Sequence, residues 1–226
     1  MIVGIDTSLG TAVAVVEDDG VVRAEASSEN PLAHAEVIGT LLQNVLAGAA
    51  HGPVGATTAA TPVEVTHVAA GMGPGPFTGL RVGIAAARAF ALGRSVPVVA
   101  VPSHDAAALA LLMHAALADP FDDASRFAVV TDARRREYAY SVYDGLDDDG
   151  IPVRVAGPAL APRDDVDAVL AGLGAERRDV TAIPAAMVAA LAARAIAAGR
   201  ALTGDEPLYL RAPDVTLPAA SKRVSA

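Results

Sequence analysis

The sequence contains no cysteine and no tryptophan, and Lys222 is the only lysine among its 17 basic residues. Without cysteine there is no disulfide framework, no thiol nucleophile and no thiolate metal site, so we expect a cytoplasmic protein. Apolar stretches are interrupted by glycine, proline, arginine or aspartate before they reach membrane-spanning length. The first residues do not show the basic segment followed by an apolar segment that is typical of a secretory signal. The sequence therefore predicts neither contact with a membrane nor a secretory signal.

The charge balance limits the kind of partner. The 26 acidic residues outnumber the 17 basic ones, which gives a net charge of −9, and aromatic residues make up only 4% of the chain. Proteins that hold RNA or DNA by themselves need a basic surface to displace counterions, and many also stack bases on aromatic rings. We therefore expect any contact with RNA to be indirect. At 226 residues and 53% hydrophobic, the chain is long and apolar enough to bury a large core.

The hydrophobic pattern predicts an α/β fold with mixed sheets. Apolar β-branched runs flank Asp18-Asp19-Gly20, a typical hairpin signal, and helical spacing of apolar residues follows. The expected elements are strands 2–6, 11–17 and 21–26, helix 31–47, strand 64–70, helix 78–92, strand 96–101, helix 105–117, strands 127–132, 137–143 and 153–156, and helices 163–173 and 184–198. The second half begins like the first, which predicts an N-terminal lobe of residues 1–102 and a C-terminal lobe with a tail, residues 103–226.

A loop rich in glycine and proline, Gly71-Met72-Gly73-Pro74-Gly75-Pro76-Phe77-Thr78-Gly79-Leu80-Arg81-Val82-Gly83, lies between a predicted strand and helix. Backbone amides in such a place can bind an anion, which makes Gly73 and Gly75 candidate cofactor-binding residues. The loop is neither a Walker loop nor a dinucleotide fingerprint, and its prolines remove donors. The alternative is a rigid turn that fixes the helix against the sheet.

Two charged clusters also have two interpretations each. The run Arg134-Arg135-Arg136 is able to contact phosphate, or it forms a solvated hairpin turn between flanking acidic residues. The run Asp147-Asp148-Asp149 lacks the alternating spacing and the terminal glutamate of a calcium loop, so we expect a solvated turn.

Five segments in order resemble the motifs of one protein family. These are Ile5-Asp6-Thr7-Ser8, His34-Ala35-Glu36, the glycine loop (family pattern GPGSFTGLRIG), Asp132-Ala133-Arg134-Arg135-Arg136-Glu137-Tyr138 (family pattern Asp-Ala-Arg-Arg-Gly-Glu-Val-Tyr), and Glu206-Pro207-Leu208-Tyr209-Leu210-Arg211. They span nearly the whole chain and resemble the bacterial TsaB (YeaZ) family of the actin, sugar-kinase and heat-shock ATPase superfamily. The resemblance implies two RNase H-like lobes.

The resemblance implies a role in making threonylcarbamoyladenosine at position 37 of tRNAs that read ANN codons. Members act there as the non-catalytic partner of a longer paralogue, TsaD, with the ATPase TsaE, or pair with themselves. TsaD binds its metal through a His-x-x-x-His pair, but His104 is followed four residues later by Ala108, and His34 by Ile38. We therefore expect no metal, no cofactor and no catalytic residue, and we interpret both histidines as surface or capping residues.

The superfamily also suggests a role for Asp6. In its active members an aspartate on the first strand orients a metal-bound nucleotide phosphate, so Asp6 is a candidate cofactor-binding residue. The alternative is that Asp6 accepts hydrogen bonds from its own turn. The adenosine-binding glycines of the superfamily are represented only by Gly172-Leu173-Gly174-Ala175. A small ATP-dependent kinase of the same superfamily is the alternative function.

The predicted partner surface lies on two helices of the first lobe. Gly79, Gly83 and Ala87 recur every four residues and form a stripe of small side chains. Glycine within a helix is unfavourable, which indicates that something approaches the backbone closely. That neighbour is either another part of the lobe or, as the resemblance implies, a partner that packs on this helix together with Val37 and Leu41.

Overall fold

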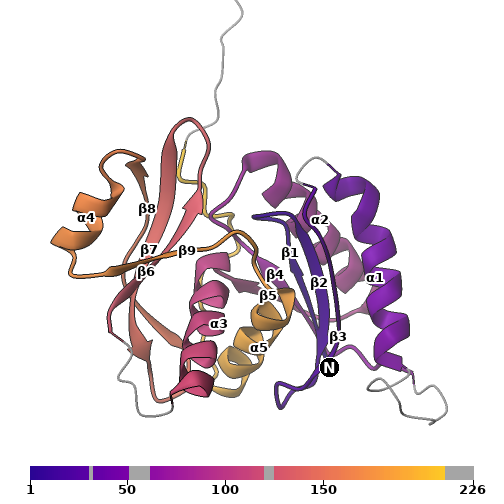
Figure 1. Cartoon of the computed structure of the whole chain (residues 1–226). Helices are drawn as coiled ribbons and strands as arrows, with labels where there is room; N and C mark the ends of the chain where they lie inside the picture. Colours follow the sequence, from indigo (N-terminus) through magenta and orange to yellow (C-terminus); the bar gives the residue numbers. More distant parts are fainter. Residues whose placement is uncertain (31–32, 51–61, 120–124, 212–226) are drawn as a thin grey trace, which may run out of the picture.

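The computed structural model describes residues 1–30, 33–50, 62–119 and 125–211, and it contains two mixed sheets (Figure 1). The first sheet has the strand order β3-β2-β1-β4-β5 and the second the order β8-β7-β6-β9. The elements in chain order are β1 (Ile2–Asp6), β2 (Thr11–Val16), β3 (Val22–Ser28), α1 (His34–Ala50), β4 (His67–Gly71), α2 (Phe77–Arg94), β5 (Val98–Val101), α3 (Ser103–Ala118), β6 (Phe127–Asp132), β7 (Glu137–Leu146), β8 (Pro152–Pro162), α4 (Val166–Gly172), β9 (Glu176–Asp179) and α5 (Ala185–Ala197).

The second sheet repeats the arrangement of the first. In each sheet an antiparallel hairpin opens the chain, a third strand extends it, and a fourth strand then pairs in parallel with the opening strand. The sequence predicted this repetition from the two hairpins. The predicted boundary after residue 102 falls between β5 and α3.

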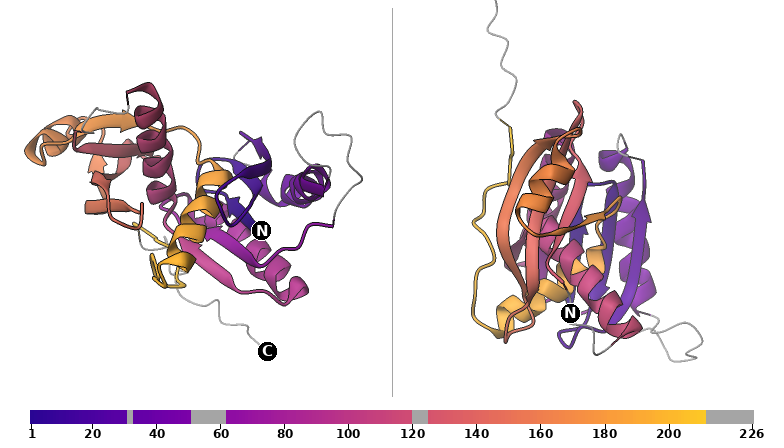
Figure 2. Two further views of the ribbon diagram at one scale, coloured as in Figure 1. Left: turned by 90° about the horizontal axis from the view of Figure 1, so that it is seen from below. Right: turned by 60° about the vertical axis from the view of Figure 1, so that its left-hand side comes forward.

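The helices form layers on the two faces of the first sheet. Helices α1 and α2 cover one face, and α5 covers the other, so every residue of β1 and β2 is buried (Figures 1 and 2). Burial on both faces explains why residues 2–5 and 12–16 are apolar instead of alternating with polar residues. Helix α3 packs between α5 and the second sheet.

One hydrophobic core joins the two sheets. It contains Ile2 of β1, Leu109 of α3, Phe127 and Tyr143 of the second sheet, and Leu191 of α5. Because α5 follows β9 in the chain yet packs on β1 and β2, the end of the sequence contributes to the core at its beginning. The orientation of the sheets is therefore set by shared packing as well as by the chain between them.

The observed elements differ from the predicted ones mainly at their ends. Helix α1 begins at His34, and residues 31 and 32, at the predicted start, lie outside the described residues. Strand β9, Glu176–Asp179, was not predicted because all four of its residues are charged and carry no hydrophobic pattern. The segment forms a strand because it pairs in parallel with β6. Within the described ranges, no helix combines the length and the apolar character needed to cross a membrane.

Candidate functional site

Asp6 lies at the end of β1, where its carboxylate is enclosed by the protein's own donors. Its Oδ1 accepts the amide of Ser8 at 2.7 Å, and its Oδ2 accepts the Ser103 hydroxyl at 2.5 Å and the Ser8 hydroxyl at 3.3 Å. All three residues are almost fully buried. Burial raises the pKa of the Asp6 carboxyl above its usual value, although the hydrogen bonds act in the opposite direction.

The glycine loop closes over this network. The Ser103 hydroxyl accepts the amide of Gly73, and the amide of Ser103 donates to the Gly73 carbonyl. A Cβ on Gly71 would lie 1.9 Å from Asp6 Oδ2, and one on Gly75 would lie 2.9 Å from the Cα of Ser8. The glycines therefore let the loop approach β1 and its turn. This close packing agrees with the interpretation of the loop as a rigid turn.

The two interpretations of Asp6 differ in whether its carboxylate is accessible. The hydrogen bond from the Ser8 amide is the turn contact that the structural interpretation predicted. Ser103, 97 residues later in the chain, is an additional partner that the sequence analysis missed. With Asp6 only 2% exposed and both of its oxygens engaged, a nucleotide phosphate has no access to it in this conformation.

The interpretation of His104 as a surface or capping residue is wrong. His104 is fully buried at the start of α3, with Nδ1 2.9 Å from the Ser141 hydroxyl and Nε2 3.0 Å from the Thr131 hydroxyl. Burial lowers the pKa of this imidazole to about 3, assisted by the nearby positive charge of Arg154. Through these two hydroxyl groups, the neutral ring joins α3 to β6 and β7.

The pKa of His104 has a measurable consequence. We expect an NMR titration to find its imidazole neutral down to about pH 4, with the resonance identified from a His104→Gln variant. An unfolded histidine takes up a proton near pH 6.5, so His104 reduces the free energy of unfolding by about 1.4 kcal/mol per unit as pH falls from 6.5 towards 3. Asp6 and Asp105 have raised pKa values in the folded protein. Above the pKa values of the unfolded chain, they therefore increase the free energy of unfolding as the pH falls, which opposes the effect of His104. Protonation of His104 near pH 6.5 in the folded protein would contradict this expectation.

His34 is also buried, which corrects the same interpretation. Its Nδ1 lies 2.8 Å from the Thr11 hydroxyl, so the first residue of α1 is joined to the start of β2. No local pattern indicates this contact, because the two residues belong to different elements.

The stripe of small residues on α2 faces the interior of the first lobe. Gly79, Gly83 and Ala87 are buried, and a Cβ on Gly83 would lie 2.1 Å from Oγ1 of Thr7. The Thr7 hydroxyl also donates to the carbonyl of Gly79 at 2.8 Å. The close neighbour of the stripe is therefore β1 and its turn, which corrects the prediction that these three residues face a partner. Val37 and Leu41 on α1 are half-buried.

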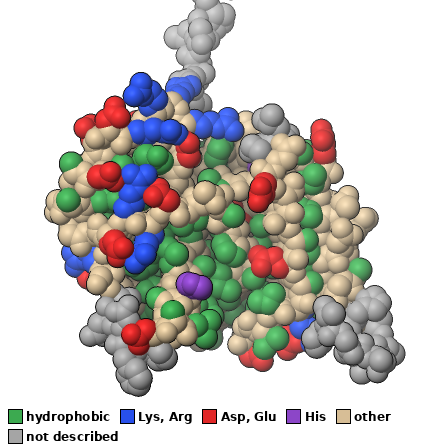
Figure 3. Space-filling model, viewed as in Figure 1, with side chains coloured by type: hydrophobic (Ala, Val, Ile, Leu, Met, Phe, Trp, Pro, Cys, Tyr) green, Lys and Arg blue, Asp and Glu red, His purple; other side chains and the backbone are tan. Residues whose placement is uncertain are grey.

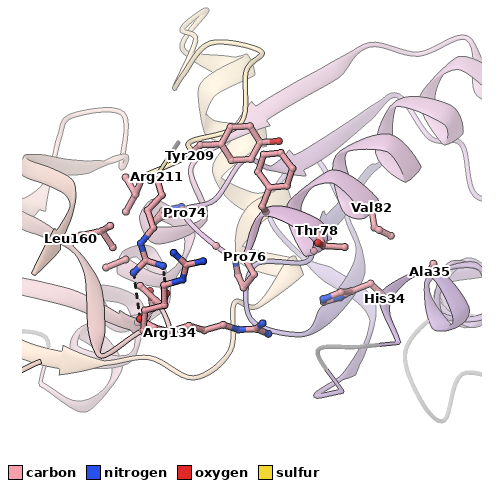
Figure 4. A pocket seen from close by; sticks show the side chains of 18 residues that line it. His34, Ala35, Pro74, Pro76, Thr78, Val82, Arg134, Leu160, Tyr209 and Arg211 are labelled. Carbon is pink, nitrogen blue, oxygen red and sulfur yellow. Dashed lines mark hydrogen bonds between the residues drawn. The ribbon is translucent and has the colours of Figure 1, made fainter. Parts of the chain in front are cut away.

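A pocket of about 710 Å³ opens between the two sheets beside the enclosed Asp6 (Figure 4). Residues 74–79, at the start of α2, line its first wall, and Thr131, Ala133, Arg134, Arg135, Ala139 and Leu160 of the second sheet line the opposite wall. His34, Ala35, Val82 and residues 209–211 complete it. Figure 4 shows Arg134 and Arg211 on one side of the pocket, with Pro76, Thr78 and His34 towards the other. We call it the inter-sheet pocket.

The segment 205–211 runs across both halves of the molecule. The amide of Leu208 donates to the Met72 carbonyl, and Tyr209 packs against Phe77 with ring centroids 4.7 Å apart. Further along, Arg211 donates to the carboxylate of Glu137 and to the carbonyl of Ala133. The Pro-x-Tyr-Leu-Arg ending noted in the sequence therefore forms a strap from the glycine loop to the β6–β7 turn.

The β6–β7 turn has an unusual backbone. Arg134, Arg135 and Arg136 have φ angles of 61°, 52° and 61°, and the left-handed region costs roughly 1–2 kcal/mol for each residue other than glycine. The family pattern has glycine at the third of these positions, where glycine avoids that cost. The Asp132 carboxylate accepts the amide of Arg134 and, with Arg211, holds the turn in place. The hairpin turn is as predicted.

The remaining candidates lie away from the pocket. Asp147 accepts the amides of Asp149 and Ile151 and pairs with Arg200, so the acidic run forms a solvated turn as expected. Residues 172–175 connect α4 to β9 and do not line the inter-sheet pocket. Among the described residues, no group of three or more histidine or acidic side chains is placed to hold a metal ion.

Comparison with known proteins agrees with the motifs. A model of the TsaD family, described as tRNA N6-adenosine threonylcarbamoyltransferase, matches residues 16–160. An uncharacterized protein of Mycobacterium tuberculosis is 36% identical over 223 residues, covering 94% of this chain and 92% of that protein. The Escherichia coli tRNA threonylcarbamoyladenosine biosynthesis protein TsaB is 30% identical over 151 residues, covering 66% of this chain and 57% of that protein.

A solved structure supports the fold. YeaZ from Pseudomonas aeruginosa superposes with a TM-score of 0.65 over 92% of this chain and 99% of that one, at 22% sequence identity. The predicted α/β fold with two mixed sheets is confirmed by this likeness and by the strand orders. The family model covers more than half of the chain. The chain therefore belongs to the family that this model describes, and it is similar to the TsaB (YeaZ) proteins, which its motifs also resemble.

Proposed function

We propose that the chain is a non-catalytic subunit that binds and activates TsaD in the threonylcarbamoylation of adenosine 37 of tRNAs that read ANN codons. The name of the matching family model and that of the Escherichia coli relative both support a role in threonylcarbamoyladenosine synthesis. In this proposal TsaD carries out the transfer, and the ATPase TsaE joins the assembly.

The enclosed carboxylate of Asp6 carries the non-catalytic part of the proposal. A kinase of this superfamily needs that aspartate accessible to a metal-bound phosphate, whereas here both oxygens accept hydrogen bonds from Ser8 and Ser103. Opening the site requires the Gly73–Gly75 segment to move away from Ser8, which breaks the bonds that join the loop to α3. The fold supports a scaffold better than a catalyst.

The outward face of α1 is the surface that we assign to TsaD. Helices α1 and α2 lie side by side on one face of the first sheet (Figure 1). The stripe of small residues on α2 faces the interior of the first lobe. Glu36 is the only charged residue of α1, and its exposed positions from Gly39 to Gly48 are small or uncharged. In a chain with 19% charged residues, such a face is typical of the centre of a protein interface, from which charge is depleted.

The acidic balance supports contact with tRNA through the complex instead of through this chain alone. A net charge of −9 opposes the release of counterions from a phosphate backbone. The arginines do gather over the second sheet in Figure 3, but acidic side chains lie among them.

The proposal is tested against the kinase alternative by measuring ATP turnover of the purified chain. We expect no turnover above the protein-free blank, in the wild type or in an Asp6→Asn variant. The same preparation should retain TsaD from the same organism in a pull-down. Turnover by the isolated chain that disappears in folded Asp6→Asn would replace the scaffold with a kinase.

A further inference from the structure

We propose that the strap, residues 205–211, is a latch that holds the two sheets together across the inter-sheet pocket and that opens at its Arg211 end. The other end of the strap stays bound to the first lobe when the latch opens. This proposal does not depend on the role with TsaD, and it assigns no ligand to the pocket. It concerns what sets the distance between the two walls.

On one side of the pocket, the sheets are joined through two helices. Helix α5 covers the first sheet, α3 packs on the second sheet, and the two helices pack on each other. Ser103, the first residue of α3, donates to Asp6 of the first sheet. His104, the next residue, is bonded to Thr131 and Ser141 of the second sheet. The two halves therefore meet at the start of α3, and a rotation there changes the width of the pocket.

The strap joins the two walls a second time. Its residues 209–211 line the inter-sheet pocket together with the start of α2 and the β6–β7 turn. Figure 4 shows Tyr209 above the α2 side and Arg211 beside Arg134 on the opposite side. A segment that is bound to both walls opposes their separation. The strength of its two attachments therefore decides whether and where it opens.

Apolar packing holds the strap on the first lobe. Leu208 and Tyr209 pack against the core of this lobe, and the Leu208 amide donates to the Met72 carbonyl at 2.8 Å. The Tyr209 ring lies 4.7 Å from the ring of Phe77. The Arg81 guanidinium lies 3.7 Å from the centre of the Phe77 ring and donates to the Tyr209 hydroxyl. Salt does not screen apolar contacts, so we expect this end to stay attached.

The guanidinium of Arg211 holds the strap on the second lobe. It donates to the Ala133 carbonyl at 3.1 Å, to the Arg134 carbonyl at 3.4 Å and to the Glu137 carboxylate. The side chains of Arg211 and Glu137 are each 32% exposed. Ion pairs that water reaches are weakened by salt and stabilise a fold only modestly. This end is therefore the weaker attachment, and the latch opens here.

Opening at Arg211 also affects the β6–β7 turn. Residues 134–136 hold left-handed conformations, which are unfavourable for residues other than glycine. Arg211 bonds to two carbonyls of this turn, so its departure leaves the Asp132 carboxylate, which accepts the Arg134 amide, to hold the conformation. We therefore expect the turn to become more dynamic whenever the latch is open.

The test measures the distance between the two lobes by double electron–electron resonance of spin labels. The chain contains no cysteine, so labels attach only at introduced cysteines. Ala85 of α2 and Ala171 of α4 are exposed and lie in different lobes, which suits Ala85→Cys with Ala171→Cys. We expect one main distance at low salt. Adding Arg211→Gln should raise the ratio of a longer, open distance to the closed one by about tenfold or more, because charge-assisted hydrogen bonds are lost.

The matched control lies at the other end of the strap. Arg88 is exposed and donates to the Asp205 carbonyl at 2.6 Å. Arg88→Gln removes a hydrogen bond of the same kind from the first-lobe end, where Leu208 and Tyr209 keep the strap in place. Its ratio of open to closed distances should lie within about twofold of that of the labelled parent.

Salt provides a measurement that needs no change in the strap. Raising the ionic strength from about 0.1 M to about 1 M shortens the Debye length from about 10 Å to about 3 Å. The open distance should become more populated in the labelled parent, and much less so in Arg211→Gln, which has already lost the ion pair. An absence of any salt effect in the labelled parent would overturn the proposal, even if Arg211→Gln fails to fold.

Hydrogen exchange shows which end opens. In folded Arg211→Gln, the amides of Ala133 and Glu137, which are bonded within the β6–β7 turn, should exchange faster than in the wild type. The amide of Leu208 should keep its wild-type rate. Faster exchange at Leu208 alone would place the weak end on the first lobe. An unchanged distance distribution in folded Arg211→Gln, or an equal change in Arg88→Gln, would also overturn the latch.

Discussion

Replacing Gly83 by alanine should lower the free energy of unfolding by about 2–4 kcal/mol, although alanine is the better helix former. The added Cβ would lie 2.1 Å from Oγ1 of Thr7, whose hydroxyl donates a buried hydrogen bond to the carbonyl of Gly79. To accommodate the methyl group, α2 must move away from β1 or Thr7 must give up its bond. Either change costs more than the roughly 0.5–1 kcal/mol gained from helix propensity.

Gly39 provides the matched control for this prediction. It lies on the exposed face of α1, and a Cβ there would meet nothing within 4 Å. Gly39→Ala should therefore raise the free energy of unfolding by about 0.5–1 kcal/mol. Urea titrations of both variants measure the difference. If Gly83→Ala is stabilised as much as Gly39→Ala, the stripe does not pack on β1 in solution.

A charge placed on the outward face of α1 should remove the association with TsaD while leaving the subunit folded. Thr40 is exposed and next to Leu41 on the uncharged surface, and arginine is a better helix former than threonine. In the complex, the guanidinium would be desolvated without a partner, which costs roughly 2–5 kcal/mol. We therefore expect Thr40→Arg to weaken TsaD binding by about thirtyfold or more, measured by surface plasmon resonance.

An equivalent substitution on another helix controls for the added charge. Ala116 is exposed near the end of α3. Helix α3 packs against α5 and the second sheet, whereas α1 covers the opposite face of the first sheet. Ala116→Arg should bind TsaD as the wild type does, within about twofold. Normal binding by Thr40→Arg would place the interface elsewhere, and equal loss in both variants would indicate a general effect of net charge.

Local patterns were sufficient to predict most of the elements. The hairpin at Asp18–Gly20, the apolar strands and the helices all follow from periodicity and turn residues within each segment. Strand β9 did not follow, because its four charged residues form a strand through pairing with β6. Its structure is decided by a neighbour 49 residues earlier in the chain.

The candidate site was predicted less completely for the same physical reason. Asp6 and the glycine loop were identified from their own residues, but one partner of Asp6 is Ser103, the first residue of α3, 97 residues later in the chain. His104 was expected to be a surface or capping residue because no second histidine follows four residues later. Its hydroxyl partners, Thr131 and Ser141, belong to strands of the second sheet and could not be identified from the local sequence. A single sequence shows which side chains are polar, but tertiary packing decides which of them meet inside the core.

The proposed role is tested most directly by reconstituting threonylcarbamoyladenosine formation from TsaD, TsaE, tRNA and the preformed threonylcarbamoyl donor. We expect no product from this chain without TsaD, a strong increase when the wild-type chain joins TsaD, and an increase within about twofold of that with folded Asp6→Asn. The carboxylate accepts hydrogen bonds from Ser8 and Ser103, and our proposal gives its charge no part in the transfer. Product from the chain alone, or loss of the increase in Asp6→Asn that still binds TsaD, would contradict a non-catalytic subunit.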